Sequence, residues 1–96
     1  MKLRVVFRRQ ASEELLEAAR NYDQKSLGLG ADFVEEVEVL LERVVRHPEM
    51  YPVVERDARR GLLRRFPYAV FYLVTDDAVV VLAVFNCTRE PGSWRR

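Results

Sequence analysis

Arginines are concentrated in one short part of this 96-residue chain. Five of the ten residues from 56 to 65 are arginine, and the stretch RRGLLRRFPYAVFYLV continues from them into an aromatic, β-branched segment. Arginine keeps its charge at physiological pH, and its planar fork can bind phosphate or carboxylate through two hydrogen bonds. The cluster therefore has two interpretations. It binds an anionic group, or it is a charged sheet edge that discourages aggregation between strands.

Alternation along a strand separates neighbouring side chains onto opposite faces, so Arg64 and Arg65 are expected to have different roles. In the anion-binding interpretation, Arg65 and Arg89 lie on adjoining strand ends and join Arg59 and Arg60 in one patch. For Arg64, binding and edge protection stay equally open.

The tail EPGSWRR offers a similar choice. Trp94 either folds back onto the core, or contacts a target together with Arg95 and Arg96.

Groups that exchange protons near neutral pH are scarce beside these arginines. His47 is the one histidine, and its place before Pro48 at a helix end predicts an interaction with the helix dipole. Cys87 is the one cysteine and has no histidine beside it in the sequence. The chain has no glycine-rich phosphate loop and no spacing typical of metal ligands, so we predict neither a cofactor nor a metal.

Composition indicates a single globular domain over residues 1–96, with 49% hydrophobic and 32% charged residues. No apolar run approaches the ~20 residues of a membrane span, and a lone cysteine is typical of reducing compartments. We therefore expect a cytoplasmic protein without membrane contact. Residues 12–55 carry four basic and eleven acidic groups, whereas both flanks are basic. This layout predicts one acidic and one basic face.

The expected elements are a strand at 2–7, two helices, and three more strands. The first helix is predicted to begin at Ser12, which caps it, and to end at the LGLG of 27–30. The second helix is predicted to be capped by Asp32 and to end before Pro48. Residues 48–61 are a predicted connector. Strands are expected at 62–66, 68–74 and 79–85, with a turn at TDDA. The order β-α-α-β-β-β predicts an α+β domain, in which an antiparallel helical hairpin packs on a mostly antiparallel sheet ending in a three-stranded antiparallel meander.

Both faces of the strand at 68–74 are apolar, although two helices can cover only one. The second face is predicted either to be a groove for a partner or to be closed by the C-terminal segment and the connector. The groove residues assigned on this strand are Tyr68, Val70 and Tyr72.

Four stretches in this order, RHPEMYP, RRGLLRRFPYAVFYLV, TDDA and VVVLAVFNCTREPGSW, resemble the RelE/ParE superfamily of type II toxin–antitoxin toxins. The resemblance covers essentially the whole chain. It implies a small cytoplasmic toxin whose antitoxin wraps around it, with operator DNA contacted only through the antitoxin. RelE-like members cut mRNA on the ribosome without a metal, and ParE-like members poison DNA gyrase. The two long helices are more similar to the ParE-like branch.

The resemblance favours a binding role for Arg65 and Arg89, which would stabilise the scissile phosphate if the chain were a ribonuclease. Family members often have a histidine at the end of the last strand, where this chain has Asn86, which cannot exchange a proton near neutral pH. A ribonuclease could instead recruit Glu55 or Glu90, since some members of the superfamily use lysine, tyrosine or glutamate. We therefore expect a ParE-like gyrase inhibitor first. A RelE-like endoribonuclease is the second interpretation, and a non-toxic antitoxin-binding or co-repressor module the third.

Overall fold

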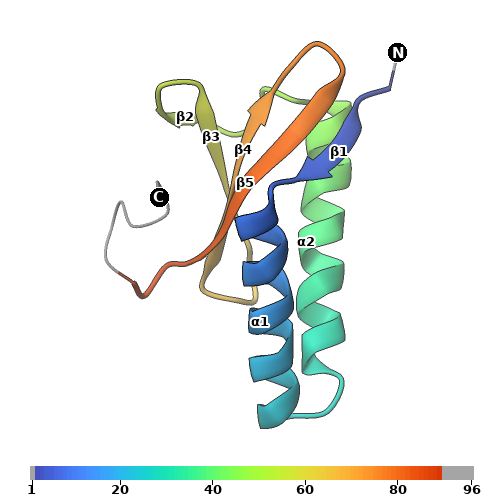
Figure 1. Ribbon diagram of the computed structural model, residues 1–96, viewed down its shortest axis with the longest axis vertical. Helices are drawn as coiled ribbons and strands as arrows, with labels where there is room; N and C mark the ends of the chain where they lie inside the picture. The colour runs from blue at the N-terminus through green and yellow to red at the C-terminus, as the bar shows by residue number, and fades with distance from the viewer. Residues whose placement is uncertain (1, 90–96) are drawn as a thin grey trace.

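The computed structural model of the chain describes residues 2–89. Two helices and five strands follow one another in the predicted α+β arrangement (Figure 1). Neither helix in this part of the chain combines the length and the apolar character needed to cross a membrane. The elements are β1 Arg4–Phe7, α1 Arg9–Lys25, α2 Leu29–Arg46, β2 Val53–Glu55, β3 Ala58–Leu62, β4 Tyr68–Val74 and β5 Ala78–Asn86.

The strands form one sheet in the order β1-β5-β4-β3-β2. β3, β4 and β5 make the predicted antiparallel meander, with Tyr68 opposite Asn86 and Val74 opposite Val79. β1 lies parallel to β5 and pairs Val5 with Val79. Parallel neighbours need a long crossover connection. Here the helical hairpin and the strands β2 to β4 supply it, which leaves β1 as one edge of the sheet.

The prediction for residues 48–66 is wrong in two respects. The expected connector contains β2 and most of β3, which form a hairpin around a tight turn where Arg56 has a positive φ of 50°. β3 therefore ends at Leu62, where the predicted strand was expected to begin. The hairpin was missed because its strands are short and its turn, Arg56-Asp57, lacks the glycine that usually marks such turns.

The start of α1 also differs from the prediction, because Ser12 lies inside the helix. The helix begins at Arg9, and Arg8 occupies the cap position without a capping side chain. The N–H of Arg8 still donates to the carbonyl of Val81 at 3.0 Å, as part of the β1–β5 pairing. The chain thus passes from strand to helix with no intervening turn in which Ser12 could act as a cap.

The helical hairpin is closed by Asp23 rather than capped by Asp32. Oδ1 of Asp23 accepts the N–H groups of Gly28 and Gly30, at 3.2 and 2.8 Å, and so caps α2 from the end of α1. Gly28 has a φ of 92°, in the left-handed region that favours glycine. A side chain at Gly30 would place its Cβ 2.3 Å from the carbonyl oxygen of Ala19, so glycine there lets the helices approach closely.

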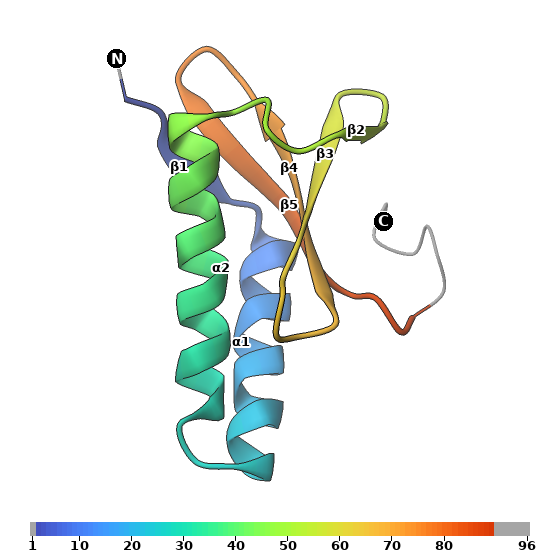
Figure 2. The ribbon, with the colours of Figure 1, turned by 180° about the vertical axis from the view of Figure 1, so that it is seen from behind.

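The apolar stripe of α2 packs on one face of the sheet, as predicted. Its buried residues include Phe33, Val37 and Val44, each fully buried. Both helices lie on the same side of the sheet, as the front and back views show (Figures 1 and 2). The buried strand residues of this core are Val70, Tyr72, Val79, Val81 and Val84.

The opposite face of the sheet has a second apolar cluster. Ala69 and Phe71 of β4 pack there with Ala83 and Phe85 of β5, and none of the four is more than 8% exposed. This cluster accounts for the strand that reads as apolar on both faces. Because its side chains are buried, this second face of β4 and β5 is not an open groove.

Candidate functional site

Residues 63–67 join β3 to β4 and carry Arg64 and Arg65. The segment is irregular, so the prediction that strand alternation separates the two arginines is wrong. The main-chain N–H groups of both arginines donate to Oε2 of Glu36 on α2, with a distance of 3.3 Å for Arg65. One helical carboxylate thus fixes the backbone of both arginines and leaves their side chains exposed.

The guanidinium of Arg65 makes two further contacts. Its Nη2 lies 3.6 Å from Oδ2 of Asp32, and its Cζ lies 5.3 Å from the centre of the Phe66 ring. The Arg65 side chain is nevertheless 61% exposed, so the ion pair adds little stability. Its effect is to restrict the orientation of Arg65. Because a guanidinium has five N–H donors, Arg65 retains donors for an anionic partner.

Arg89 lines a small cleft between α1 and the adjoining ends of β4 and β5. Acidic groups from α1 face the arginine across this cleft, and no histidine lines it. The other residues that line it are Glu14, Glu17, Ala18, Asn21, Tyr68, Val84, Phe85 and Asn86.

Tyr68 is the phenol in this cleft. Burial raises its pKa above the ordinary value of 10.0, and Glu17 and Glu14 add to the rise, while Arg89 and a hydrogen bond with Asn86 oppose it. A phenol with a raised pKa stays protonated at neutral pH and is a poor general base. The other groups that could exchange a proton in this cleft are the carboxylates of Glu14 and Glu17, and Glu14 already accepts the N–H of Val84 at 2.8 Å.

Asn86 holds the turn that carries Arg89. Its Oδ1 accepts the N–H of Thr88 at 2.9 Å and the hydroxyl of Thr88 at 2.7 Å. Its carbonyl accepts the N–H of Arg89 at 3.0 Å. Asparagine is favoured in such turns because its short side chain can bond the backbone two residues onward. The residue that stands in place of the family's frequent histidine thus has a structural role here.

Arg65 and Arg89 lie at the same end of the sheet. The N–H of Cys87 donates to the carbonyl of Pro67 at 2.7 Å, which joins the segment after β5 to the loop between β3 and β4. The two arginines nevertheless contact different helices. Arg65 forms an ion pair with Asp32 of α2, and Arg89 lines the cleft beside α1.

The neighbouring residues Arg59 and Arg60 have different environments. Arg59 is half-buried on the helix-facing side, and its Nη1 donates to the carbonyls of Tyr51 at 2.7 Å and Glu49 at 3.2 Å. Arg60 is exposed and pairs with Phe71, whose side chain belongs to the opposite face. Arg59 therefore supports the chain before β2, whereas Arg60 is free to meet a partner.

Arg60 also lies near the segment after β5. Partial burial raises the pKa of the Cys87 thiol, and the positive charge of Arg60 opposes that rise. Arg60, which pairs with Phe71 in the middle of β4, is thus within electrostatic reach of the segment that is hydrogen-bonded to Pro67.

The three residues predicted to line an antitoxin groove belong to the core. Val70 and Tyr72 are fully buried beneath the helices, and the Tyr72 hydroxyl donates to the carbonyl of Pro48 at 3.2 Å. Tyr68 is half-buried, with its ring centre 4.9 Å from that of Phe33. No partner can reach Val70 or Tyr72 unless the helical hairpin moves, which corrects the expectation of an open groove at these residues.

The remaining predicted residues lie apart from Arg65 and Arg89 or outside the described part of the chain. His47 is exposed at the end of α2, where its N–H donates to the carbonyl of Arg43 at 2.8 Å. Glu55 is half-buried at the end of β2. The predicted residues outside the described range 2–89 are Glu90, Trp94, Arg95 and Arg96.

Two acidic residues that shape the site were not predicted. Glu36 positions the arginine loop, and Glu14 accepts the N–H of Val84 at 2.8 Å, which attaches α1 to β5 beyond the end of β1. Both lie in helices rich in exposed carboxylates, and no sequence signal distinguishes them from residues such as Glu35. Only the tertiary fold identifies them.

A family model described as "ParE toxin of type II toxin-antitoxin system, parDE" matches residues 5–91 of the chain. The fold is similar to a solved structure titled "Chromosomal ParDE TA system from P. aeruginosa", with a TM-score of 0.62 and 16% sequence identity. The likeness covers 88% of this chain and 96% of that one. No curated protein is similar enough to count as a match. Because the family model spans most of its length, the chain belongs to the ParE toxin family of type II toxin–antitoxin systems.

Proposed function

We propose that the chain inhibits DNA gyrase and is held inactive by a cognate antitoxin. The observation that carries this proposal is the match of the ParE toxin family over residues 5–91, which begins within β1 and includes both helices and the strands β2 to β5. Gyrase and its DNA are in the cytoplasm, where we expect the toxin to act.

The target-binding residues in this proposal are Arg60, Arg65 and Arg89, with Trp94, Arg95 and Arg96 of the tail. Arg60 and Arg65 are exposed cations on a fixed backbone, and Arg89 is carried by a hydrogen-bonded turn. Such preorganised guanidinium groups suit carboxylates on a protein, or phosphates of the DNA that gyrase holds. Arg59, which the sequence also suggested, is assigned to support the fold, because its guanidinium already bonds two carbonyls.

The surroundings of Arg89 support binding over RNA cleavage. A metal-free ribonuclease must remove a proton from a 2′-hydroxyl and return one to the leaving oxygen. Beside Arg89 the structure has a tyrosine with a raised pKa and an asparagine engaged in a turn. Neither is suited to that proton transfer at neutral pH, and of the two carboxylates in the cleft Glu14 already accepts the N–H of Val84, which leaves Glu17. RNA cleavage and loss of toxicity are the two alternative results that induction of the chain in cells would detect.

The experiment is induction of the chain in cells that lack its antitoxin, with two readouts. Gyrase inhibition predicts DNA breaks and filamentous cells while bulk mRNA stays intact. Cleaved mRNA with an early stop in translation would instead identify a ribonuclease, and normal growth would identify a non-toxic module.

The same induction tests the residues. Arg65→Ala and Arg89→Ala are expected to reduce toxicity, and Arg20→Ala, which removes an exposed arginine from α1, is the matched control. Full toxicity in both site variants would contradict the assignment of the binding residues.

A further inference from the structure

Arg64 does not lie on an edge strand of the sheet. The last pair of the β3–β4 ladder is Leu62 with Ala69, and Arg64 follows in the irregular loop of residues 63–67. β3 itself lies between β2 and β4 in the sheet order. Charged side chains discourage aggregation where they lie on an exposed edge strand. Edge protection therefore does not explain an arginine at this position.

The loop is anchored in the core on both sides of its two arginines. Leu63, before Arg64, is 8% exposed, and Phe66, after Arg65, is 6% exposed. The ring centre of Phe66 lies 5.2 Å from that of Phe33 on α2. Two buried side chains thus fix the ends of the loop, and the arginine side chains between them are exposed.

The Glu36 carboxylate fixes the main chain between these two anchors. Its Oε2 accepts the N–H groups of both Arg64 and Arg65. Asp32, one turn earlier on α2, pairs with the Arg65 guanidinium at 3.6 Å. Among residues 2–89, no carboxylate forms an ion pair with the guanidinium of Arg64. The loop therefore presents one oriented guanidinium and a second whose N–H donors remain available to a partner.

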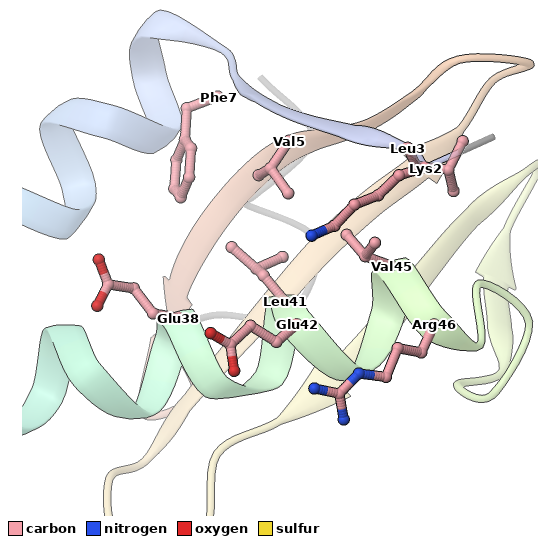
Figure 3. A pocket seen from close by; sticks show the side chains of 9 residues that line it. All are labelled: Lys2, Leu3, Val5, Phe7, Glu38, Leu41, Glu42, Val45 and Arg46. Carbon is pink, nitrogen blue, oxygen red and sulfur yellow. The ribbon is translucent and has the colours of Figure 1, made fainter.

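The charge around the loop favours carboxylates of a protein over the phosphates of a nucleic acid. A groove of about 630 Å³ on the side of α2 that faces β1 is also lined by carboxylates of that helix (Figure 3). The acidic residues of α2 are Asp32, Glu35, Glu36, Glu38 and Glu42. Nucleic acids bind mainly through basic residues that together neutralise many phosphates, and this helix would repel such a polyanion. A carboxylate on a protein surface can instead pair with a single guanidinium.

We propose that Arg64 and Arg65 together bind acidic side chains on the protein target, and that Glu36 is the positioning residue of their loop. The inference rests on the proposed function for the identity of the target, and it adds Arg64 to the residues assigned there. Glu36 acts through the main chain, so it sets the position of both arginines without contact with the target.

The test is the affinity of the purified chain for gyrase without DNA, together with inhibition of supercoiling. Arg64→Ala is expected to weaken both by about fivefold or more, and Arg64→Glu, which reverses the charge, is expected to weaken them further. Arg20→Ala, at an exposed arginine of α1, is the matched control and is expected to change both by less than about twofold. Thermal unfolding of each variant shows that a loss of binding is not a loss of folding.

The role of Glu36 is tested by a rescue and by a combination of variants. Glu36→Ala is expected to weaken binding about fivefold or more at a temperature where it stays folded, and Glu36→Gln, which retains an acceptor oxygen, should bind nearly as the parent does. When Arg64→Ala and Arg65→Ala are already present, adding Glu36→Ala should change affinity less than about twofold. A further fivefold loss in that background would show that Glu36 does not act through the two arginines.

The possible results separate this inference from the proposed function. If the parent inhibits gyrase and Arg64→Ala behaves as Arg20→Ala does, the assignment of Arg64 is wrong and the proposed function stands. If the chain binds gyrase only when DNA is present, and Arg64→Ala weakens that complex, the arginines contact phosphate and the assignment to a protein surface fails. If the parent neither binds nor inhibits gyrase, the proposed function fails and this inference fails with it.

Discussion

The Glu36 carboxylate on α2 accepts the main-chain N–H of Arg65 at 3.3 Å, and the same oxygen accepts the N–H of Arg64. The other carboxylate oxygen, Oε1, is buried and has no hydrogen-bond partner among the described residues. The carboxylate is thus partly desolvated in order to hold a loop whose two side chains are exposed. We infer that the position of this loop matters to the function of Arg65.

Glu36→Ala is expected to destabilise the fold by about 1–3 kcal/mol, because two main-chain donors lose their acceptor. Glu36→Gln retains an acceptor oxygen and is expected to cost less. Glu35→Ala, at an exposed neighbour on the same helix, is the control and should stay within about 0.5 kcal/mol of the parent. Urea unfolding measures all three variants. Equal stabilities for Glu36→Ala and Glu35→Ala would show that the loop does not depend on this carboxylate.

Arg59→Ala and Arg60→Ala should separate a supporting arginine from an exposed one. Arg59 donates charge-assisted hydrogen bonds to two carbonyls while half-buried, so its loss is expected to cost about 1–2 kcal/mol. Arg60 is exposed, and its loss should change unfolding by less than about 0.5 kcal/mol. Thermal and urea unfolding provide the comparison. The assignment of roles would be reversed if Arg60→Ala proved the more destabilising.

Gly30→Ala tests the close approach of the two helices. The added Cβ would lie 2.3 Å from the carbonyl oxygen of Ala19 and 2.9 Å from Cγ of Asp23, so the hairpin must move apart. We expect a loss of about 1–3 kcal/mol, although alanine favours a helix more than glycine does. Ala31→Ser at the next, exposed position is the control. A gain in stability for Gly30→Ala would mean that the helices do not pack as closely as described.

The buried phenol of Tyr68 is expected to make the free energy of unfolding depend on pH in the alkaline range. Burial raises the pKa of its phenol above the value of 10.0 expected in the unfolded chain, so the unfolded state loses the proton first. This contribution to stability is fully present below about pH 10 and is lost as the pH rises through the folded-state pKa. Tyr68→Phe should therefore make stability less steeply dependent on pH in that range. Urea unfolding at several pH values measures how the free energy of unfolding depends on pH, and absorbance at the tyrosinate band follows the phenol. If the dependence on pH were the same in Tyr68→Phe and the parent, the phenol would not be buried as described.

Periodicity predicted the parts of the fold that depend on burial. The α2 stripe with Phe33, Val37 and Val44 and the bounds of β4 agree with the structure because apolar spacing reports directly on which face is covered. Ser12 and β3 were misplaced because their positions depend on tertiary contacts. Arg8 continues the pairing to β5, and the chain leaves β3 where Glu36 binds the following loop.

The candidate site was predictable only as a set of residue types. Arg65 and Arg89 stand out by charge and by the family resemblance, but their separate contacts with Asp32 and with the α1 cleft cannot be read from spacing. An open groove was expected at Tyr68, Val70 and Tyr72 because a strand that is apolar on both faces does not show which face is covered. Here both faces of β4 carry buried clusters, and its exposed valine, Val74, lies at the end of the strand.

The most direct test of the central claim is a supercoiling assay with purified gyrase, relaxed plasmid and the purified chain. The account predicts that the chain inhibits supercoiling and leaves cleaved DNA. Prior addition of the antitoxin should restore activity, and combining Arg65→Ala with Arg89→Ala should weaken inhibition about tenfold relative to Arg20→Ala. Full supercoiling at every concentration of a chain that stops growth in cells would contradict the account.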